Sequence, residues 1–415
     1  MRIAVLGAGV AGVATAWQLL KDGHQVTVID RAPGPAEFTS YANAGLVAPG
    51  HSYAWSSPAA PGTMLRSLWR GDQAIRFKPR LSVRQWAWMA RFLGQCHAAG
   101  AKINTARKSR LCVYSQAMLD QVVAETGITY DGQGGGLVYF YRSPQAFEAA
   151  AVKCNILRDA GIEIEVLDRD ATVAKDPGLA AAASLIAGSV FATTDASGDA
   201  NLFTIELARV CAEAGAVFRY GEAVLDLRAR DNAITAVVTD KGDVVADAYV
   251  LSLGVHSPHL VERLGIRLPI YPVKGYSATL KITDPAQAPR LGGVDEENLL
   301  AYCPMGGRLR LTATAEIAGY STAYKRRDFR VMFQKARGLF AGAADFDNAE
   351  LWAGLRPMTP TGMPVIDRSP YANLWLNTGH GHMGWTMANG AARILADLVA
   401  QRQTAIGREG MTYEG

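Results

Sequence analysis

The chain begins Met1-Arg-Ile-Ala-Val-Leu-Gly-Ala-Gly-Val-Ala-Gly12, and this stretch decides the fold. Residues 2–6 are a short apolar run with β-branched side chains, which predicts a buried parallel strand. In the motif that follows, Gly7 suits a tight turn, Gly9 lets backbone approach a pyrophosphate, and Gly12 lets a helix pack on the strand. The spacing therefore predicts the first turn of a dinucleotide-binding unit.

The residues up to Arg31 agree with this prediction. A helical pattern from Val13 to Leu20 is stopped by Gly23, and Gln25-Val-Thr-Val-Ile29 predicts a second strand. Asp30 follows that strand, at the place where a carboxylate accepts hydrogen bonds from ribose hydroxyls. The N-terminus of the helix offers free N–H groups and a positive dipole to phosphates. The alternative is a glycine turn with a structural role alone.

Length and composition restrict the class of protein. A chain of 415 residues fits two domains of ordinary size, and 49% hydrophobic with 19% charged residues is typical of a soluble globular protein. No apolar run approaches the roughly 20 residues that span a bilayer. The chain enters its first strand without a signal-peptide pattern, so we expect a cytoplasmic protein. The five cysteines are odd in number and widely spaced, which favours free thiols over disulfides and predicts no metal site.

The positive charges are unevenly distributed. The net charge of +4 is too small to indicate nucleic-acid binding, but residues 66–110 contain eleven Lys or Arg and one acid, Asp72. Aromatic side chains are interleaved with them: Trp69, Phe77, Trp86, Trp88 and Phe92. A charge run of this kind usually lies on a solvated face, with its aromatic residues turned into the core. The alternative is an anionic membrane surface, where such rings lie at the level of the headgroups.

Two regions of the chain differ in pattern from the nucleotide-binding unit. Residues 33–61 are rich in Gly, Pro, Ser and Ala and are expected to form a loop, with small residues beside a cofactor. Residues 51–187 look like a mixed insertion, and residues 269–349 like its continuation. The expected elements are helices at 82–95, 111–126, 145–160 and 325–340, and strands at 137–141, 276–282 and 308–314.

The nucleotide-binding unit is expected to resume at Gly198 with a helix capped by Asp199 or Asn201. Three short strands then follow, with turn signals at 231–232 and 241–242, before a buried strand that ends at Gly254. Such a β-meander is usual in flavoproteins of the glutathione-reductase type. We therefore predict an α/β fold with two domains. Residues 1–50, 188–268 and 350–415 form a discontinuous FAD-binding Rossmann domain, and residues 51–187 and 269–349 an α+β substrate domain with a mixed or antiparallel sheet.

A second signature lies near the C-terminus. The strand 374–378 runs into Gly379-His-Gly-His-Met-Gly384, and a helix follows from about Thr386 to Leu398. Glycines at such a strand-to-helix turn indicate a close approach to a ligand, here a flavin ring; the alternative is a tight turn only. His380 and His382 have no acid or cysteine nearby, so lining the turn is favoured over binding a metal.

Arg356 lies in Leu351-Trp-Ala-Gly-Leu-Arg-Pro-Met358 and is the predicted substrate residue. A residue before proline has a restricted backbone, and a guanidinium can bind a carboxylate through two hydrogen bonds. The alternative is an arginine held in a structural salt bridge.

At this point the chain resembles the bacterial FAD-dependent D-amino acid dehydrogenases of the D-amino acid oxidase and glycine oxidase superfamily. The resemblance runs nearly end to end. The motifs that carry it are Val5-Leu-Gly-Ala-Gly-Val-Ala-Gly12, Ala42-Asn-Ala-Gly45, Tyr271-Pro-Val-Lys-Gly-Tyr276, Gly354-Leu-Arg-Pro-Met-Thr-Pro360, Leu376-Asn-Thr-Gly-His-Gly381 and Gly384-Trp-Thr-Met387. It implies non-covalent FAD and a substrate domain whose sheet covers the flavin.

The resemblance also implies site residues. Arg356 would hold the substrate carboxylate, with Tyr276 or Tyr53 assisting and His382 nearby. The expected cofactor-binding residues are Gly7, Gly9, Val10, Ala11, Gly12, Asp30, Arg31, Ser40, Asn43, Ala44, Gly45, Leu46, Val224, Gly254, Gly354, Gly379, Gly381, His382, Met383, Gly384, Trp385 and Thr386. The chain departs from the family pattern in three places: Thr-Ala replaces Gly-Gly within 311–316, His382-Met383 replaces a small or apolar pair, and Asp367 replaces a glycine.

The implied reaction is oxidative deamination of a D-amino acid to a 2-oxo acid and ammonia. FAD performs the oxidation by hydride transfer from the substrate α carbon to flavin N5, and no side-chain base is required if the amine is deprotonated. A quinone or similar acceptor at the inner membrane would take the electrons. The alternatives are a D-hydroxyproline or other secondary-amine dehydrogenase, a peroxide-producing oxidase, a non-catalytic flavin-binding electron-transfer subunit, and an NAD-dependent reductase.

Overall fold

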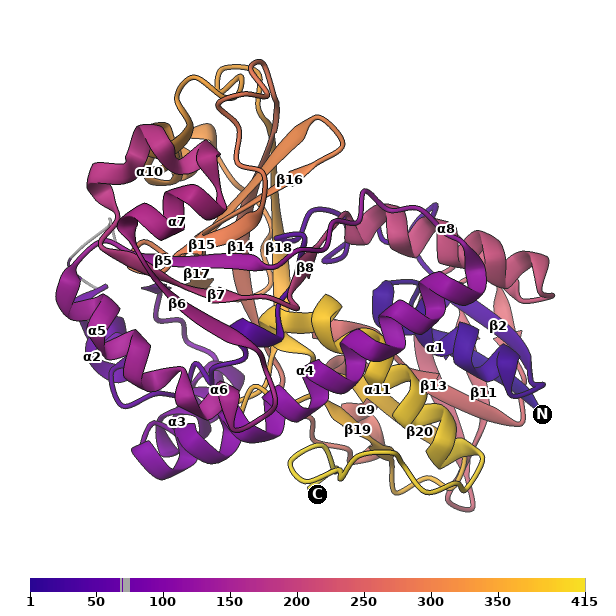
Figure 1. Cartoon of the computed structure of the whole chain (residues 1–415). Helices are drawn as coiled ribbons and strands as arrows, with labels where there is room; N and C mark the ends of the chain where they lie inside the picture. The colour runs from indigo at the N-terminus through magenta and orange to yellow at the C-terminus, as the bar shows by residue number, and fades with distance from the viewer. Residues whose placement is uncertain (68, 70–74, 415) are drawn as a thin grey trace.

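The predicted N-terminal strand lies inside a largely parallel sheet. The computed structural model describes residues 1–67, 69 and 75–414 (Figure 1). The order of the first sheet is β19-β20-β13-β1-β2-β9. Its strands are β1 (Arg2–Leu6), β2 (Gln25–Asp30), β9 (Val217–Tyr220), β13 (Ala248–Leu251), β19 (Val365–Arg368) and β20 (Leu374–Thr378). Neighbouring strands are parallel, except that β19 runs antiparallel to β20. The buried parallel strand predicted for residues 2–6 is confirmed.

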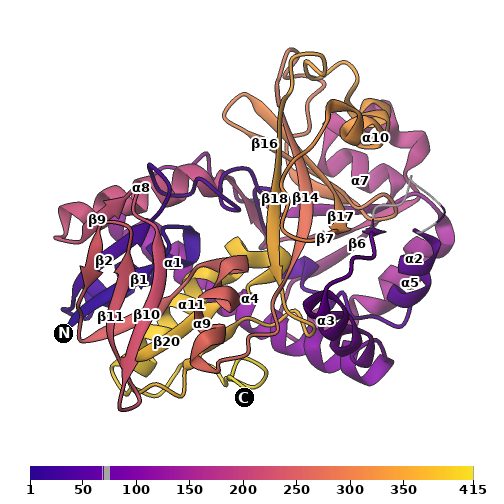
Figure 2. The same cartoon turned by 180° about the vertical axis from the view of Figure 1, so that it is seen from behind.

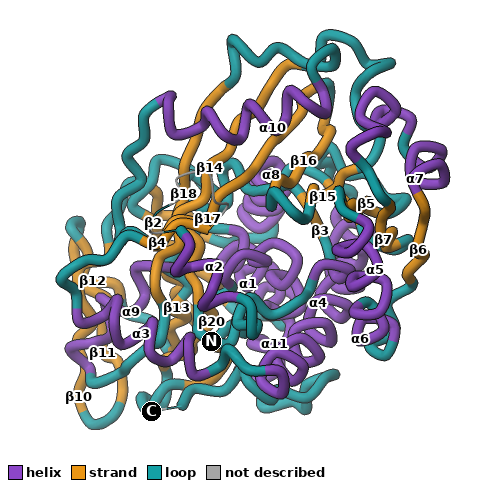
Figure 3. The backbone as a smooth tube through the Cα atoms, turned by 90° about the vertical axis from the view of Figure 1, so that its left-hand side faces the viewer, coloured by secondary structure: helices purple, strands orange, loops and turns teal. Residues whose placement is uncertain are grey.

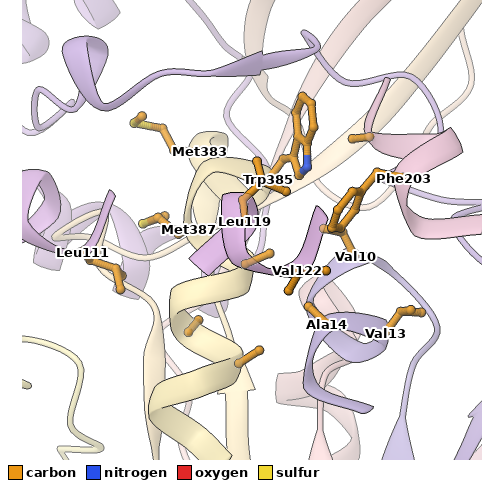
Figure 4. Packing of buried hydrophobic residues seen from close by; sticks show 14 of the residues in the cluster. Val10, Val13, Ala14, Leu111, Leu119, Val122, Phe203, Met383, Trp385 and Met387 are labelled. Atoms are coloured by element: carbon orange, nitrogen blue, oxygen red, sulfur yellow. The ribbon is translucent and has the colours of Figure 1, made fainter. Parts of the chain in front are cut away.

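Four helices cover one face of this sheet. They are α1 (Val10–Lys21), α4 (Ala98–Thr126), α8 (Ala200–Glu213) and α11 (Gly384–Val399). Val13 of α1, Val122 of α4 and Met387 of α11 belong to one buried cluster, as Figure 4 shows. The other face is covered by α9 (Ser257–Val261) and by the meander β10 (Val224–Arg230), β11 (Ala233–Thr239) and β12 (Gly242–Val244). The predicted β-meander is therefore confirmed.

A second, mixed sheet has the order β18-β14-β17-β16-β15-β5-β7-β6, with β4 paired to β17. Its strands are β4 (Ile75–Phe77), β5 (Leu137–Tyr141), β6 (Ile164–Asp168), β7 (Gly188–Ala192), β14 (Tyr271–Lys281), β15 (Gly292–Asp295), β16 (Leu300–Met305), β17 (Arg308–Ile317) and β18 (Glu350–Met358). Helices α7 (Arg169–Lys175) and α10 (Arg330–Phe340) pack on it, and α10 crosses its strands in Figure 3. Figure 2 shows β14 and β18 standing between the first sheet and α10.

The remaining elements connect the two sheets. They are the ladder β3 (Leu46–Val47) with β8 (Ala196–Ser197), the helices α2 (Ala60–Arg66), α3 (Val83–Gly94), α5 (Pro144–Lys153) and α6 (Asn155–Arg158), and the 3-10 helices η1 (Pro49–His51), η2 (Pro177–Leu185), η3 (Gly254–His256), η4 (Glu262–Leu264), η5 (Arg326–Phe329) and η6 (Gly381–Met383). None of the helices in the described ranges combines the length and the apolar content needed to cross a bilayer. The cysteines are free thiols.

The two sheets divide the chain differently from the predicted domain boundaries at three places. Strands β7 and β18 belong to the second sheet, although 188–268 and 350–415 were assigned to the FAD-binding domain. Helix α4, from the predicted substrate domain, packs on α11 and covers the first sheet. Its first three turns are polar and basic, so the apolar pattern revealed only the half after residue 110. The helix predicted for 145–160 is interrupted between α5 and α6.

The aromatic side chains of the basic stretch 66–110 divide between the core and the surface. Trp88 and Phe92 are buried in a core cluster, as a solvated basic face predicts, whereas Trp69 and Trp86 are exposed. Residues 68 and 70–74, which include Asp72, lie outside the described residues.

Candidate cofactor and substrate site

A cavity of about 650 Å³ extends between the two sheets. Residues 7–11 line one end, and strands β14, β17 and β18 line the other. The predicted site residues that line it are Gly7, Gly9, Val10, Ala11, Asp30, Arg31, Ser40, Asn43, Ala44, Gly45, Leu46, Val224, Gly254, Tyr276, Gly354, Arg356, Gly381, His382, Met383, Gly384, Trp385 and Thr386. The predicted residues Gly12, Gly379 and Tyr53 are not among those that line this cavity.

The first glycine turn has the geometry that its sequence predicts. Gly7 has φ +110°, and a Cβ there would lie 2.6 Å from the carbonyl oxygen of Ser252. A Cβ at Gly12 would lie 1.9 Å from the carbonyl oxygen of Gly7, so Gly12 serves helix packing and does not face the cavity. At Gly9 the nearest atom to a Cβ is the Ser40 hydroxyl, at 3.4 Å, which leaves this backbone open to a ligand.

Asp30 fixes the turn from the end of β2. Its carboxylate accepts hydrogen bonds from the backbone N–H of Ala8 at 2.7 Å and of Ala32 at 2.9 Å. A carboxylate has about four lone-pair sites, so acceptor capacity remains for ribose hydroxyls. At the same end of the cavity, the Arg31 guanidinium lies 4.6 Å over the Phe38 ring and 3.1 Å from Nε2 of His256.

Residues far apart in sequence meet at the middle of the cavity. The Thr386 hydroxyl accepts a hydrogen bond from the Ala48 N–H at 3.1 Å and donates to the Leu46 carbonyl at 3.3 Å. Helix α11 begins at Gly384, so its N-terminal N–H groups and positive dipole lie at the cavity wall. Gly45 has φ +74°, and a Cβ there would lie 2.4 Å from Cε of Met305. Gly379 has φ +80° but meets Thr359 instead of the cavity, in agreement with a tight turn.

These features fit FAD. A glycine turn and a carboxylate at one end suit the adenosine and pyrophosphate, and a helix N-terminus beside Gly45 suits a flavin ring. His380 and His382 each keep a buried Nε2 without a hydrogen-bond partner among the described residues. The described residues contain no group of three or more His, Cys, Asp or Glu that could hold a metal ion.

Arg356 lies at the far end of the cavity from Asp30. It projects from β18 over β14, and its Nη1 donates to the Thr314 carbonyl at 3.1 Å. Burial lowers the pKa of Arg356 to about 10. None of the ion pairs found in the described part of the chain includes this guanidinium. A buried cation without an acidic partner is costly, and an anionic ligand would supply that partner.

The two predicted tyrosines, Tyr276 and Tyr53, have other contacts than Arg356. The Tyr276 hydroxyl donates to Glu316 at 3.4 Å, and the ring packs on Phe329, on the opposite side of β14 from Arg356. Strand alternation explains this placement, because Gly275 is the residue of β14 that faces the guanidinium. Tyr53 packs under the Lys153 ammonium, which lies 3.9 Å over its ring.

His382 is brought close to Arg356. Burial holds the pKa of His382 well below its usual range, and the positive charges of Lys108, His51 and Arg356 lower it further. Its ring stacks on Trp55, with 4.5 Å between ring centroids and an interplanar angle of 24°.

Sequence reasoning missed several residues that line the cavity, including Trp55, His51, Thr314 and Tyr320. Trp55 was the most detectable of them, because it is a large aromatic side chain in a loop of Gly, Pro, Ser and Ala. Thr314 has φ +67°, which is rare for a β-branched residue. The signal that could have marked it is the Thr-Ala within 311–316, where the family pattern has Gly-Gly.

Comparisons with known proteins identify the family and the fold. Residues 2–398 match the family described as FAD dependent oxidoreductase. The chain is 46% identical to D-amino acid dehydrogenase 2 of Mesorhizobium japonicum, over 100% of both chains, and 44% identical to D-amino acid dehydrogenase of Cereibacter sphaeroides, over 98% of this chain and 93% of that one. Among solved structures, glycine oxidase from Geobacillus kaustophilus superposes with a TM-score of 0.79 at 21% identity, covering 100% of this chain and 98% of that chain. This likeness confirms the predicted fold class.

Proposed function

The chain belongs to the FAD-dependent oxidoreductase family and within it to the D-amino acid dehydrogenases, and we propose that Arg356 binds the substrate carboxylate in its reaction. The observation that carries this proposal is the guanidinium that lines the cavity and has, among the described residues, the Thr314 carbonyl as its one hydrogen-bond partner. A carboxylate would receive two hydrogen bonds and compensate the charge. The D-amino acid or imino acid would then present its α carbon toward the middle of the cavity.

FAD, when bound, supplies the hydride acceptor at N5. The protein would hold it without a covalent bond, through the glycine turn and Asp30 at one end and residues 43–46 with the start of α11 at the other. Trp55 and His382 stack beside Arg356 and would exclude water from the carboxylate. By fixing the orientation of the α carbon, Arg356 would raise the rate of hydride transfer in the bound complex. Acid precipitation tests the non-covalent mode: the flavin should remain in the supernatant, and flavin in the pellet would contradict it.

The direct experiment is anaerobic bleaching of the bound flavin. D-Alanine, D-phenylalanine, D-proline, D-hydroxyproline, sarcosine and the matching L-amino acids are mixed separately with the yellow holoenzyme, and absorbance near the flavin maximum is followed. Bleaching by D-amino or imino acids and not by their L-enantiomers is expected. A yellow protein that none of these compounds bleaches would contradict the proposal and would support a non-catalytic flavin-binding subunit.

For the electron acceptor we propose a quinone at a membrane surface. Large apolar side chains are exposed on and beside α2 and α3: Leu65, Trp69, Leu81, Val83, Trp86 and Leu93. Basic residues accompany them, including Arg84 and Arg91. Exposed tryptophan and leucine beside arginine suit an anionic lipid surface.

Two measurements test the acceptor. With one substrate, the rate of reduction of a soluble quinone should exceed the rate of peroxide formation. If peroxide forms as fast as the substrate is oxidised, the protein is an oxidase. Co-sedimentation with phosphatidylglycerol vesicles should fall in the double variant Leu81→Ser/Val83→Ser, whereas Val217→Ser, an exposed valine on β9, serves as the matched control. Equal sedimentation of all three proteins would contradict membrane binding through this surface.

A further inference from the structure

His51 stands at the cavity wall with a carboxylate behind it. It ends η1 and lines the cavity, and its Nε2 lies 2.9 Å from Oε1 of Glu296. The two side chains are 23% and 15% exposed, so the ion pair is largely shielded from solvent. This is an ion-pair distance and not a hydrogen bond, because Oε1 of Glu296 has no hydrogen-bond partner among the described residues. Nδ1, the ring nitrogen farther from Glu296, is the one available to a ligand.

The chain holds His51 in this position firmly. The Gly50 N–H donates to both carboxylate oxygens of Asp195 at 3.0 Å, and the Tyr139 hydroxyl donates to the same carboxylate at 2.5 Å. The Tyr139 ring in turn stacks on the His51 imidazole, with 5.2 Å between centroids and an interplanar angle of 20°. A Cβ at Gly50 would lie 2.4 Å from Cβ of Ala192, so the turn fits closely against β7.

The other acid-base groups that line the cavity are poorly suited to take a proton from a substrate at Arg356. Asp30 and Glu37 lie at the opposite end, beside the glycine turn. His256 lies there too, next to Arg31, and burial lowers its pKa to about 4.

The two histidines of the C-terminal turn are also unsuited. Burial lowers the pKa of His380 to about 4 and holds that of His382 well below its usual range. His51 differs from these in its surroundings, because a carboxylate oxygen lies 2.9 Å from its ring nitrogen. It lines the same cavity as Arg356 on the side of the second sheet, since its ring stacks on Tyr139 of β5 and lies beside Glu296, which follows β15.

This placement matters because of the chemistry of the amine. A free amino acid carries an ammonium group at neutral pH, and hydride leaves the α carbon only when the nitrogen has a lone pair to form the imine. Under the proposed function, on which this inference rests, we propose that His51, paired with Glu296, accepts a proton from the ammonium group of the substrate while Arg356 holds its carboxylate. The N–H bond breaks, its electron pair stays on nitrogen, and the proton binds Nδ1. Glu296 offsets the charge of the resulting imidazolium, and the proton returns from His51 to solvent after the product leaves.

Other charged and titratable groups face His51. They are Glu296 after β15, Tyr139 on β5, Asp195 after β7 and His382 in η6, with Lys108 of α4 donating to the Tyr53 carbonyl at 2.6 Å. The test therefore compares the pH profile of each variant with that of wild type, because the other groups are the same in both proteins.

The test compares wild-type holoenzyme with His51→Gln and Glu296→Gln in anaerobic flavin reduction by D-alanine, D-phenylalanine and D-proline across pH. The matched control is His24→Gln, a histidine in the turn before β2 and remote from the cavity. At neutral pH we expect His51→Gln to reduce kred/Kd by about 10²-fold, the usual contribution of a general base. The loss should shrink to less than about threefold once the pH exceeds the pKa of the substrate ammonium, because the free amine then arrives already deprotonated. Glu296→Gln should show the same trend with a smaller loss.

Two further readouts separate a base from a structural residue. Flavin content, and the Kd of acetate measured by its perturbation of the flavin spectrum, should be unchanged in His51→Gln, because a carboxylate without an amine needs only Arg356. A rate loss that is the same at every pH, or no loss at neutral pH, would overturn the inference. If wild-type flavin is not bleached by any of the three substrates, the proposed function itself fails, and that outcome is seen without any variant.

Discussion

A Cβ at Gly275 would lie 2.5 Å from the guanidinium carbon and from both terminal nitrogens of Arg356. The two residues belong to the antiparallel strands β14 and β18, in which Val273 is directly opposite Arg356. Gly275 follows Val273 on the same face, because side chains alternate along a strand. The absence of a side chain at Gly275 is therefore what allows the guanidinium to lie flat against the second sheet.

Gly275→Ala should displace the arginine without removing it. We expect KM for a D-amino acid to rise and kcat/KM to fall by about 10- to 100-fold, since a misplacement near 1 Å can cost about 10²-fold. Steady-state kinetics with a dye acceptor measure this, and flavin content should stay unchanged. Gly94→Ala is the matched control, because nothing lies within 4 Å of a Cβ there. Unchanged KM in Gly275→Ala would show that the guanidinium position does not matter.

Arg356→Met should remove the carboxylate partner. Truncating one member of a buried charge pair costs about 2–5 kcal/mol, so kcat/KM should fall by about 30- to 4000-fold with FAD still bound. Arg356→Lys should recover only part of this loss, because an ammonium cannot form the two parallel hydrogen bonds of a guanidinium. Normal activity of Arg356→Met at low substrate concentration would exclude the carboxylate role.

Gly12→Ala and Gly9→Ala should separate folding from cofactor binding. A Cβ at Gly12 would lie 1.9 Å from the Gly7 carbonyl oxygen, so this variant should lose about 1–3 kcal/mol of stability and also bind little FAD. At Gly9 the nearest atom would be 3.4 Å away, so the apoprotein should melt like wild type while its Kd for FAD rises. Thermal melting with and without FAD, and flavin absorbance after gel filtration, provide the measurements. Equal behaviour of the two variants would contradict the distinct roles of the two glycines.

The element patterns explain why much of the fold was predictable. The strand-turn-helix at residues 2–21 and the meander before Gly254 have local periodicity and local turn chemistry, so sequence alone indicates them. Helix α4 was only half predicted, because Lys108 is fully buried and breaks the apolar pattern. Residues 350–358 were placed in the FAD-binding domain, since the partner of β18 is β14, more than 70 residues earlier, and no local signal records that pairing.

The sequence predicted the residues at the two ends of the cavity but not all of the residues that line it between them. Asp30 and Arg356 lie within recognisable motifs, and both line the cavity. Tyr276 was expected beside Arg356 from the family resemblance, but the alternation of β14 turns its side chain away. His51 and Trp55 reach the cavity through loop geometry and through a buried network around Asp195, which involve residues far apart in the chain.

Asp195 should make stability depend on pH. Burial raises its pKa to about 7, against hydrogen bonds from Tyr139 and the Gly50 N–H that lower it. The folded chain therefore binds this proton more tightly than the unfolded chain, for which the aspartate pKa is near 4. The resulting stabilisation is fully present below about pH 4 and is lost as the pH rises through about 7.

Asp195→Asn removes this titration while keeping a hydrogen-bonding side chain. The urea midpoint of the variant, measured relative to that of wild type, should be higher at about pH 8.5 than at about pH 5. The change corresponds to a few kcal/mol of unfolding free energy at most. Urea unfolding at the two pH values, followed by circular dichroism, gives the comparison. If the urea midpoint of the variant instead falls relative to wild type as the pH rises, Asp195 is charged in the folded protein.

The contacts of β1 and α1 with β20 and α11 mean that the first sheet is completed only after the C-terminal elements have been synthesised. The Asn377 amide donates to the Thr15 hydroxyl at 2.8 Å, and the Thr386 hydroxyl receives the Ala48 N–H, so both ends of the chain complete the same wall. A ribosome releases the N-terminal strand first, at about 5–20 residues per second. The nascent chain therefore exposes its glycine turn for tens of seconds before residues 374–399 emerge to close the first sheet, and cofactor insertion must wait for the end of translation.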